Sequence, residues 1–245
     1  MIKFILSAII LVVHCLLAVI ILPIEWVVGK INKRAKDISC LRMVQFSFNL
    51  IVKISGIELT VIGEENVPKD RPVLYIGNHR SYFDVIITYA RVPDLCGYIA
   101  KKEFAKVPFL YNWMKALYCL FLDRSNPKEG LKTILQGVEY IKQGISICIF
   151  PEGTRSRLPG NEMLPFKEGS FKIAERTGCP IIPMAITNSA EIFENHFPLV
   201  KKCHVILEYG EPIMTSDLTR QEKKALGRNT RDIIQGMLDE HQKML

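Results

Sequence analysis

The chain reads VLYIGNHRSYFD from Val73 to Asp84, an apolar run that turns polar at Asn78. The run Val73–Gly77 predicts a strand, and the segment Tyr82–Tyr89 after it predicts a helix. Because the strand is apolar throughout, both of its faces are expected to be covered, as in a parallel sheet. An imidazole moves protons near neutral pH, and a nearby carboxylate can fix its tautomer. The stretch therefore predicts a strand, loop and helix that present His79 together with Asp84.

Strands and helices alternate through the rest of the chain. Strands are expected at residues 57–62, 73–77, 97–100, 117–122, 145–150, 181–186 and 204–209, and helices at residues 82–89, 101–104, 109–116, 127–142, 169–176 and 219–244. Such alternation predicts an α/β fold: a layered, mostly parallel sheet flanked by helices. In such sheets, functional residues gather outside the carboxyl ends of the strands.

Three of the expected strands end directly in residues that could carry chemistry. His79 follows residues 73–77, Arg124 follows residues 117–122, and Glu152-Gly153-Thr154-Arg155 follows residues 145–150. Because the carboxyl ends of parallel strands lie at one edge of the sheet, these residues could line one crevice.

The cations suit an anionic ligand. Arg124 and Arg155 offer guanidinium groups that match a phosphate, and Lys101 or Lys102 could add a point charge. Glu152 could hold a substrate hydroxyl. Gly153 would let the backbone approach a ligand closely.

Structural alternatives exist for each of these residues. Arg124 could form a surface ion pair with Asp123 or Glu129, Glu152 could pair with Arg155, and Lys101-Lys102 could be a solvated helix start. The sequence contains no G-x-S-x-G motif and no cysteine beside His79, so it does not indicate a protein nucleophile. The simpler scheme has His79 deprotonate an alcohol of a phosphorylated acceptor, which then attacks an activated acyl group.

Composition narrows the class of partner. The 245 residues carry a formal net charge of +7, which suits nucleic acid, a phosphorylated substrate or an anionic membrane. No motif supports nucleic-acid binding. The seven cysteines never form a C-x-x-C pair and the five histidines are dispersed, so reduced thiols are expected and no metal site is predicted.

The N-terminal segment Phe4–Leu22 contains no charged residue. As a helix it would be about 28 Å long, close to the thickness of the bilayer core. A cleaved signal peptide and a buried core helix are the alternatives. Lys30, Lys33, Arg34 and Lys36 follow, and the positive-inside bias places that side, and the catalytic body, in the cytoplasm.

A second, partly amphipathic segment covers residues 43–54. It could form a hairpin with the first segment in the membrane interface, or it could pack on the core. The expected division is residues 1–56 for membrane-associating helices and residues 57–245 for the α/β domain.

Asn78-His79-(x)4-Asp84 together with Phe150-Pro151-Glu152-Gly153-Thr154-Arg155-Ser156 resembles the membrane glycerolipid acyltransferases, and within them the 1-acylglycerol-3-phosphate acyltransferases. Two weaker blocks, Phe121–Arg124 and Ile181–Ile186, agree in order and spacing. The resemblance covers about residues 57–190 and implies a glycerol-3-phosphate acyltransferase-like fold. It also agrees with an N-terminal pair of membrane-docking helices.

The resemblance implies acyl transfer from acyl-CoA or acyl-carrier protein to the 2-hydroxyl of lysophosphatidic acid, with no cofactor. By this resemblance His79 and Asp84 are the catalytic dyad, and Arg124, Glu152, Gly153 and Arg155 bind the phosphorylated acceptor. The second block departs from the family pattern, because Tyr118 stands where a glycine is usual. Another lysolipid acceptor therefore stays open, as does a non-catalytic protein that binds anionic lipid.

Overall fold

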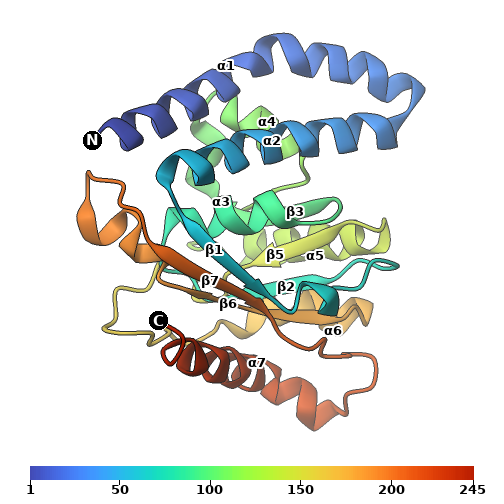
Figure 1. Cartoon of the computed structure of the whole chain (residues 1–245). Helices are drawn as coiled ribbons and strands as arrows, with labels where there is room; N and C mark the ends of the chain where they lie inside the picture. Colours follow the sequence, from blue (N-terminus) through green and yellow to red (C-terminus); the bar gives the residue numbers. More distant parts are fainter.

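The computed structural model describes residues 1–245 and has an α/β fold built on a seven-stranded sheet (Figure 1). In chain order the strands are β1 (Glu58–Ile62), β2 (Leu74–Gly77), β3 (Cys96–Lys101), β4 (Leu120–Leu122), β5 (Ser146–Ile149), β6 (Ile181–Thr187) and β7 (His204–Tyr209). The strand order is β1-β7-β6-β2-β5-β3-β4, and only the β6–β7 pair is antiparallel. The mostly parallel sheet predicted from the alternating pattern is confirmed.

Helices cover both faces of the sheet. They are α1 (Ile2–Ile31), α2 (Lys33–Ser55), α3 (Tyr82–Arg91), α4 (Leu110–Ala116), α5 (Pro127–Lys142), α6 (Lys172–Thr177) and α7 (Arg220–His241). One apolar cluster joins one face of the sheet to α2, α3 and α4, and a second joins the other face to α5, α6 and α7. On β2, Tyr75 belongs to the first cluster while Leu74 and Ile76 belong to the second. The continuous apolar run of β2 is thus buried on both faces, as expected.

Local signals in the sequence account for several helix ends. The side chain of Asn126 caps α5, which has a proline at its start, and Thr219 with Glu222 forms a capping box on α7. Gly56 takes a left-handed conformation that ends α2. These signals explain why the expected and observed helices agree closely in these places.

The strand expected at residues 117–122 is wrong over its first half. The backbone N–H groups of Leu117, Tyr118 and Cys119 bond back to α4, and Tyr118 has a φ of 60°. A left-handed residue cannot continue a strand, so β4 contains only Leu120–Leu122. The helix expected at residues 169–176 is also divided, into a 3₁₀ turn at Glu168–Phe171 and α6.

Helices α1 and α2 run antiparallel over the face of the sheet that also carries α3 (Figure 1). By length and composition alone, both are apolar enough to cross a membrane. Only Ser7, Ala18 and Glu25 of α1 are buried, and its large apolar side chains are mostly exposed. The alternative of a buried core helix is therefore wrong for α1. Helix α2 packs its inner face into the core, although Phe46 on its outer face is exposed.

Two aromatic contacts attach α1 to the body of the protein. Phe4 stacks on Phe193 with a ring separation of 5.4 Å, and His14 packs against Trp113 of α4 at 4.5 Å. The Trp113 indole also donates a hydrogen bond to the carbonyl of His14 at 2.9 Å. Helix α1 therefore lies along the body instead of projecting away from it.

Candidate active site

The carboxyl ends of β2 and β5 form the centre of the site. The two strands are parallel neighbours, so His79 after β2 and the loop Glu152–Arg155 after β5 emerge side by side. The N–H of Ser156 donates to the carbonyl of His79 at 2.7 Å and joins the two loops. On the other side, the Asn78 amide bonds both the N–H and the carbonyl of Ile186 on β6, at 2.8 and 2.9 Å. The backbone at His79 is therefore fixed from both neighbouring strands.

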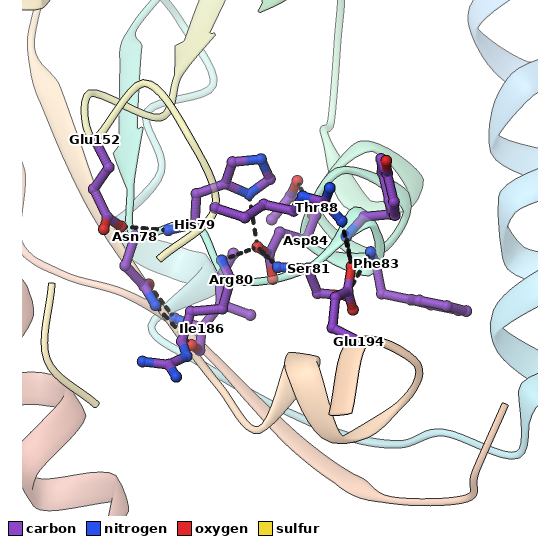
Figure 2. Close-up of polar contacts among 12 residues, drawn as sticks. Asn78, His79, Arg80, Ser81, Phe83, Asp84, Thr88, Glu152, Ile186 and Glu194 are labelled. Atoms are coloured by element: carbon purple, nitrogen blue, oxygen red, sulfur yellow. Dashed lines mark hydrogen bonds and ion pairs between the residues drawn. The ribbon is translucent and has the colours of Figure 1, made fainter. Parts of the chain in front are cut away.

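His79 and Asp84 make the contact that their spacing led us to expect. The Nδ1 of His79 lies 2.8 Å from the Oδ2 of Asp84 (Figure 2). Because a carboxylate only accepts, Nδ1 donates and the Nε2 atom is left as the proton acceptor. The imidazole also stacks on Phe150 with a ring separation of 4.5 Å. The His79 side chain is 18% exposed and Asp84 is fully buried, so the base reaches the surface while its carboxylate does not.

Asp84 also explains the five-residue spacing of the motif. Ser81 is the N-cap of α3 and Asp84 is the third residue of the helix, and together they form a capping box. The Oδ2 of Asp84 accepts from the N–H groups of Arg80 and Ser81, each at 2.7 Å. The same oxygen receives the imidazole N–H of His79, while Oδ1 is buried without a hydrogen-bond partner. One carboxylate thus starts the helix and orients the imidazole.

Glu152 connects loops within the protein. Its Oε1 accepts from the N–H of His79 at 2.7 Å, and its Oε2 accepts from the N–H of Leu164 at 2.8 Å. Burial raises the pKa of the Glu152 carboxyl above its usual range, and these two N–H groups act in the opposite direction. The alternative of a Glu152–Arg155 pair is wrong. Because both oxygens of Glu152 are engaged by backbone groups, it acts on His79 through the backbone in this structure.

Gly153 and Thr154 form the turn between Glu152 and Arg155. Gly153 has a φ of 74°, and a Cβ at this position would lie 2.6 Å from the Nζ of Lys167. The close approach that glycine permits is therefore made by Lys167, a residue that the motifs do not include. Thr154 is exposed at the tip of the turn.

Arg155 is held by two contacts that the sequence did not indicate. Its guanidinium lies over the Tyr82 ring, 3.7 Å from the ring centre, and its Nη1 atom donates to Glu194 at 3.0 Å. Glu194 belongs to the irregular segment between β6 and β7, more than one hundred positions from the His79 motif. No pattern in that segment marks Glu194, so only the fold reveals it.

The remaining cations expected at the site, Lys101, Lys102 and Arg124, lie at the carboxyl ends of β3 and β4. Strand β4 is three positions from β2, about 14 Å at the usual strand spacing. We call these three residues the edge cations. They share an edge of the sheet with His79, but no hydrogen bond or ion pair joins them to the dyad.

The edge cations form few ion pairs within the protein. Lys102 pairs with Asp123 at 2.7 Å, and Lys102 and Ser125 lower the pKa of the Asp123 carboxyl to about 2. Partial burial lowers the pKa of the Arg124 guanidinium, and Glu103 acts in the opposite direction. The surface ion pair considered for Arg124 does not form. Asp123 pairs with Lys102 instead, and Glu129 pairs with Lys132.

The backbone N–H groups beside the dyad are all engaged within the protein. Those of His79, Arg80 and Ser81 donate to Glu152 or Asp84. Those of Tyr82 and Phe83 donate to Glu194 and to the Ser81 hydroxyl. These groups are therefore not free to stabilise an oxyanion in the conformation described here.

Comparisons with known proteins indicate the family to which this chain is similar. A family model described as Acyltransferase matches residues 58–187. A protein of Saccharomyces cerevisiae named 1-acyl-sn-glycerol-3-phosphate acyltransferase is 33% identical over 195 residues, which are 79% of this chain and 64% of the yeast protein. One of the same name from Borreliella burgdorferi is 29% identical over 192 residues, which are 78% of this chain and 76% of that protein. The chain thus spans less than two thirds of the yeast relative.

The fold has a close counterpart among solved structures. The crystal structure of a 1-acyl-sn-glycerophosphate (LPA) acyltransferase from Thermotoga maritima superposes with a TM-score of 0.84 and covers 98% of this chain and 95% of that one. The sequence identity is 23%, so the match supports the fold alone.

Proposed function

Because this chain belongs to the acyltransferase family, we propose that it transfers an acyl chain to the sn-2 hydroxyl of lysophosphatidic acid and produces phosphatidic acid. The observation that carries the proposal is the oriented His79–Asp84 pair, placed beside Arg155 at the carboxyl ends of two neighbouring strands. The names of the yeast and Borreliella relatives support the choice of acceptor.

In the proposed reaction, the Nε2 of His79 takes the proton of the acceptor hydroxyl as the oxygen attacks the thioester carbonyl of the donor. The buried Asp84 carboxylate stabilises the imidazolium that forms. When the tetrahedral intermediate collapses, the C–S bond breaks and the leaving sulfur takes the proton from the imidazolium. The products are phosphatidic acid and a free thiol, so His79 returns to its neutral form and no protein nucleophile is needed.

The phosphate of the acceptor is proposed to bind Arg155, whose guanidinium is a fork-shaped donor. Thr154 and Gly153 form the turn that presents it. The edge cations are proposed to extend this positive surface towards the phosphates of the acceptor or of the donor, which is acyl-CoA or acyl-carrier protein. No cofactor takes part in the scheme.

Residues 1–56 are proposed to attach the protein to a membrane, and residues 57–245 to form the catalytic domain. The exposed apolar side chains of α1 support this division. Lys30, Lys33, Arg34 and Lys36 support a cytoplasmic position for the catalytic domain. A lysolipid would then reach the site directly from the membrane surface.

The first test is the variant His79→Ala, assayed in detergent with oleoyl-CoA and lysophosphatidic acid. Loss of the general base should lower kcat by about 10²–10⁴-fold without a matching loss of thermal stability. His204→Ala is the matched control, since His204 lies on β7 and bonds Thr60 of β1, away from the site. Turnover by His79→Ala at the level of the wild type would contradict the mechanism.

A further inference from the structure

The connection between β6 and β7 exposes apolar side chains beside α1. Phe197 is 72% exposed and Leu199 is 41% exposed, whereas the adjacent Val200 is buried. Figure 1 shows this connection, in orange, reaching the N-terminal end of α1. Single exposed apolar residues are ordinary on a protein surface, but a group that continues another apolar surface indicates an interaction site.

A row of aromatic rings joins Phe197 to α1. The ring of Phe197 meets that of Phe193 edge-on with a separation of 5.4 Å, and Phe193 in turn stacks on Phe4. Ile2 and Ile5, which are close to Phe4 in the sequence, are exposed as well. The exposed apolar surface of α1 therefore continues onto the β6–β7 connection.

Lysines border this surface. Lys201 and Lys202 follow directly after the apolar residues, and both are exposed. The ammonium of Lys3, from the first turn of α1, and the side chain of Lys202 both lie against Gly56, so cations from distant parts of the chain meet here. Apolar side chains bordered by cations are the combination that fits the interface of an anionic bilayer.

The acidic residues of the connection are engaged elsewhere. Glu194 bonds Arg155 and the start of α3, and Glu191 bonds Asn195. The only acidic partner of Lys202 is Glu58, at 4.0 Å, where both side chains are exposed. The lysines are therefore available to headgroup phosphates.

We propose that residues 197–202 form a second membrane-docking element, in which Phe197 and Leu199 enter the interface of an anionic bilayer and Lys201 and Lys202 bind headgroup phosphates. The inference rests on the membrane attachment of α1 in the proposed function, and it adds a docking point on the catalytic domain itself. A contact through α1 alone leaves the domain free to roll about the helix axis. A second contact away from that axis removes this freedom.

The test asks which side chains the lipid reaches, with the full-length protein in vesicles of equal parts phosphatidylglycerol and phosphatidylcholine. Bromine atoms on the acyl chains quench a tryptophan that lies among them. The protein has two tryptophans, and the variant Trp26→Phe keeps only the buried Trp113 as background. Phe197→Trp in that variant should be quenched about as strongly as the exposed Trp26 is in the wild type.

Ile233→Trp in the same variant is the matched control. Ile233 is exposed on α7, which packs on the face of the sheet opposite to the one that carries α1. The bilayer should not reach this position, so its emission should stay unquenched.

The lysines are tested through the lipid that they gather. The vesicles keep one composition, and the bromines are carried either by phosphatidylglycerol or by phosphatidylcholine. Brominated phosphatidylglycerol should quench the Phe197→Trp protein more strongly, by about twofold or more, because Lys201 and Lys202 enrich the anionic lipid beside it. Adding Lys201→Gln and Lys202→Gln should remove most of this difference, as should high salt, which screens the charges. Lys223→Gln with Lys224→Gln, the same change on α7, should leave the difference unaltered.

Two results would overturn the inference. One is a Phe197→Trp protein that is quenched no more than Ile233→Trp although Trp26 is quenched, since the connection would then face water or a protein partner. The other is equal quenching by the two brominated lipids, which would exclude the binding of anionic lipid by the lysines.

These measurements need no turnover, so they separate the inference from the proposed reaction. A protein that acylates no lysolipid but shows the expected quenching would refute the reaction and support the docking element. If neither Trp26 nor the Phe197→Trp protein is quenched, the membrane placement of residues 1–56 fails, and the inference fails with it.

Discussion

The loop after β2 and the loop after β4 both carry residues expected at the site, but their polar groups are bonded very differently. After β2, each backbone N–H from His79 to Phe83 donates to a side chain. Asp84 receives two of these hydrogen bonds and a third from the His79 imidazole. After β4, Asp123 binds Ser125 and also Lys102 from the end of β3, while Arg124 is exposed. The first loop lies beside central strands and the second lies at the edge of the sheet.

The difference follows from the tasks that the two loops are proposed to perform. A general base must keep its geometry through the reaction, and a network in which every donor is engaged provides that rigidity. A cation that attracts a phosphate acts over a longer distance and needs less exact placement. Substitutions after β2 should therefore affect turnover, and substitutions after β4 should affect binding.

The largest effect is expected at Asp84. Asp84→Asn keeps an oxygen for the backbone but cannot stabilise the imidazolium, so kcat should fall by about 10²–10⁴-fold. Asp84→Ala should show a similar loss and also unfold more easily by about 1–3 kcal/mol, because α3 loses its cap and buried donors lose their acceptor. Enzyme kinetics and urea denaturation measure the two effects.

Asp70→Asn is the control for Asp84, because Asp70 is exposed and pairs only with Arg71. If Asp84→Asn kept full turnover, the role of the carboxylate in catalysis would be excluded, and only its capping of α3 would stand.

An intermediate effect is expected at Glu152. Glu152→Gln offers one oxygen to the two N–H groups of His79 and Leu164, so one buried donor loses its acceptor. This should lower the free energy of unfolding by about 1–3 kcal/mol and also lower kcat, since the backbone of His79 is held by one contact fewer. Glu162→Gln, in the same loop and exposed, is the control. A change in KM for the acceptor alone would instead indicate direct contact with substrate.

The smallest effect on the protein itself is expected at Arg124. Arg124→Gln should change the free energy of unfolding by no more than about 0.5 kcal/mol, because the side chain is only partly buried and lies at the sheet edge. The KM for one of the two substrates should rise by about tenfold. This increase should be smaller at high salt, where the charge is screened. Lys128→Gln, an exposed neighbour, is the control. A large loss of stability in Arg124→Gln would contradict the predicted difference between the two loops.

Much of this arrangement was readable in the sequence, because it depends on local patterns. The apolar run of β2, the five-residue spacing of His79 and Asp84 and the loop after β5 are all short-range features, and the strand order brings them together. The residue at which β4 begins could not be predicted from the sequence. Tyr118 belongs to an apolar run, but its left-handed backbone ends the preceding turn, and this requirement explains why a glycine would suit the position.

The partners of Arg155 could not be predicted for a different reason. Glu194 lies in a segment without periodicity, and its contacts depend on how the β6–β7 connection folds back over α3. Glu152 was recognised as a site residue from its motif, but its two backbone hydrogen bonds depend on the course of the loop up to Leu164. Sequence patterns predicted the residues of the proposed site, but their mutual bonding depends on the tertiary structure.

The stacking of Phe4 on Phe193 has a consequence for how substrate arrives. Phe193 is the neighbour of Glu194, so the segment that covers Arg155 rests directly on α1. On the membrane placement proposed above, this fixes the mouth of the site at the height of the lipid headgroups. An acceptor that diffuses laterally in the leaflet then searches two dimensions instead of three, and it meets the protein with its headgroup already facing the arginine. Orientation that a soluble enzyme must supply from its own binding surface would here come from the bilayer.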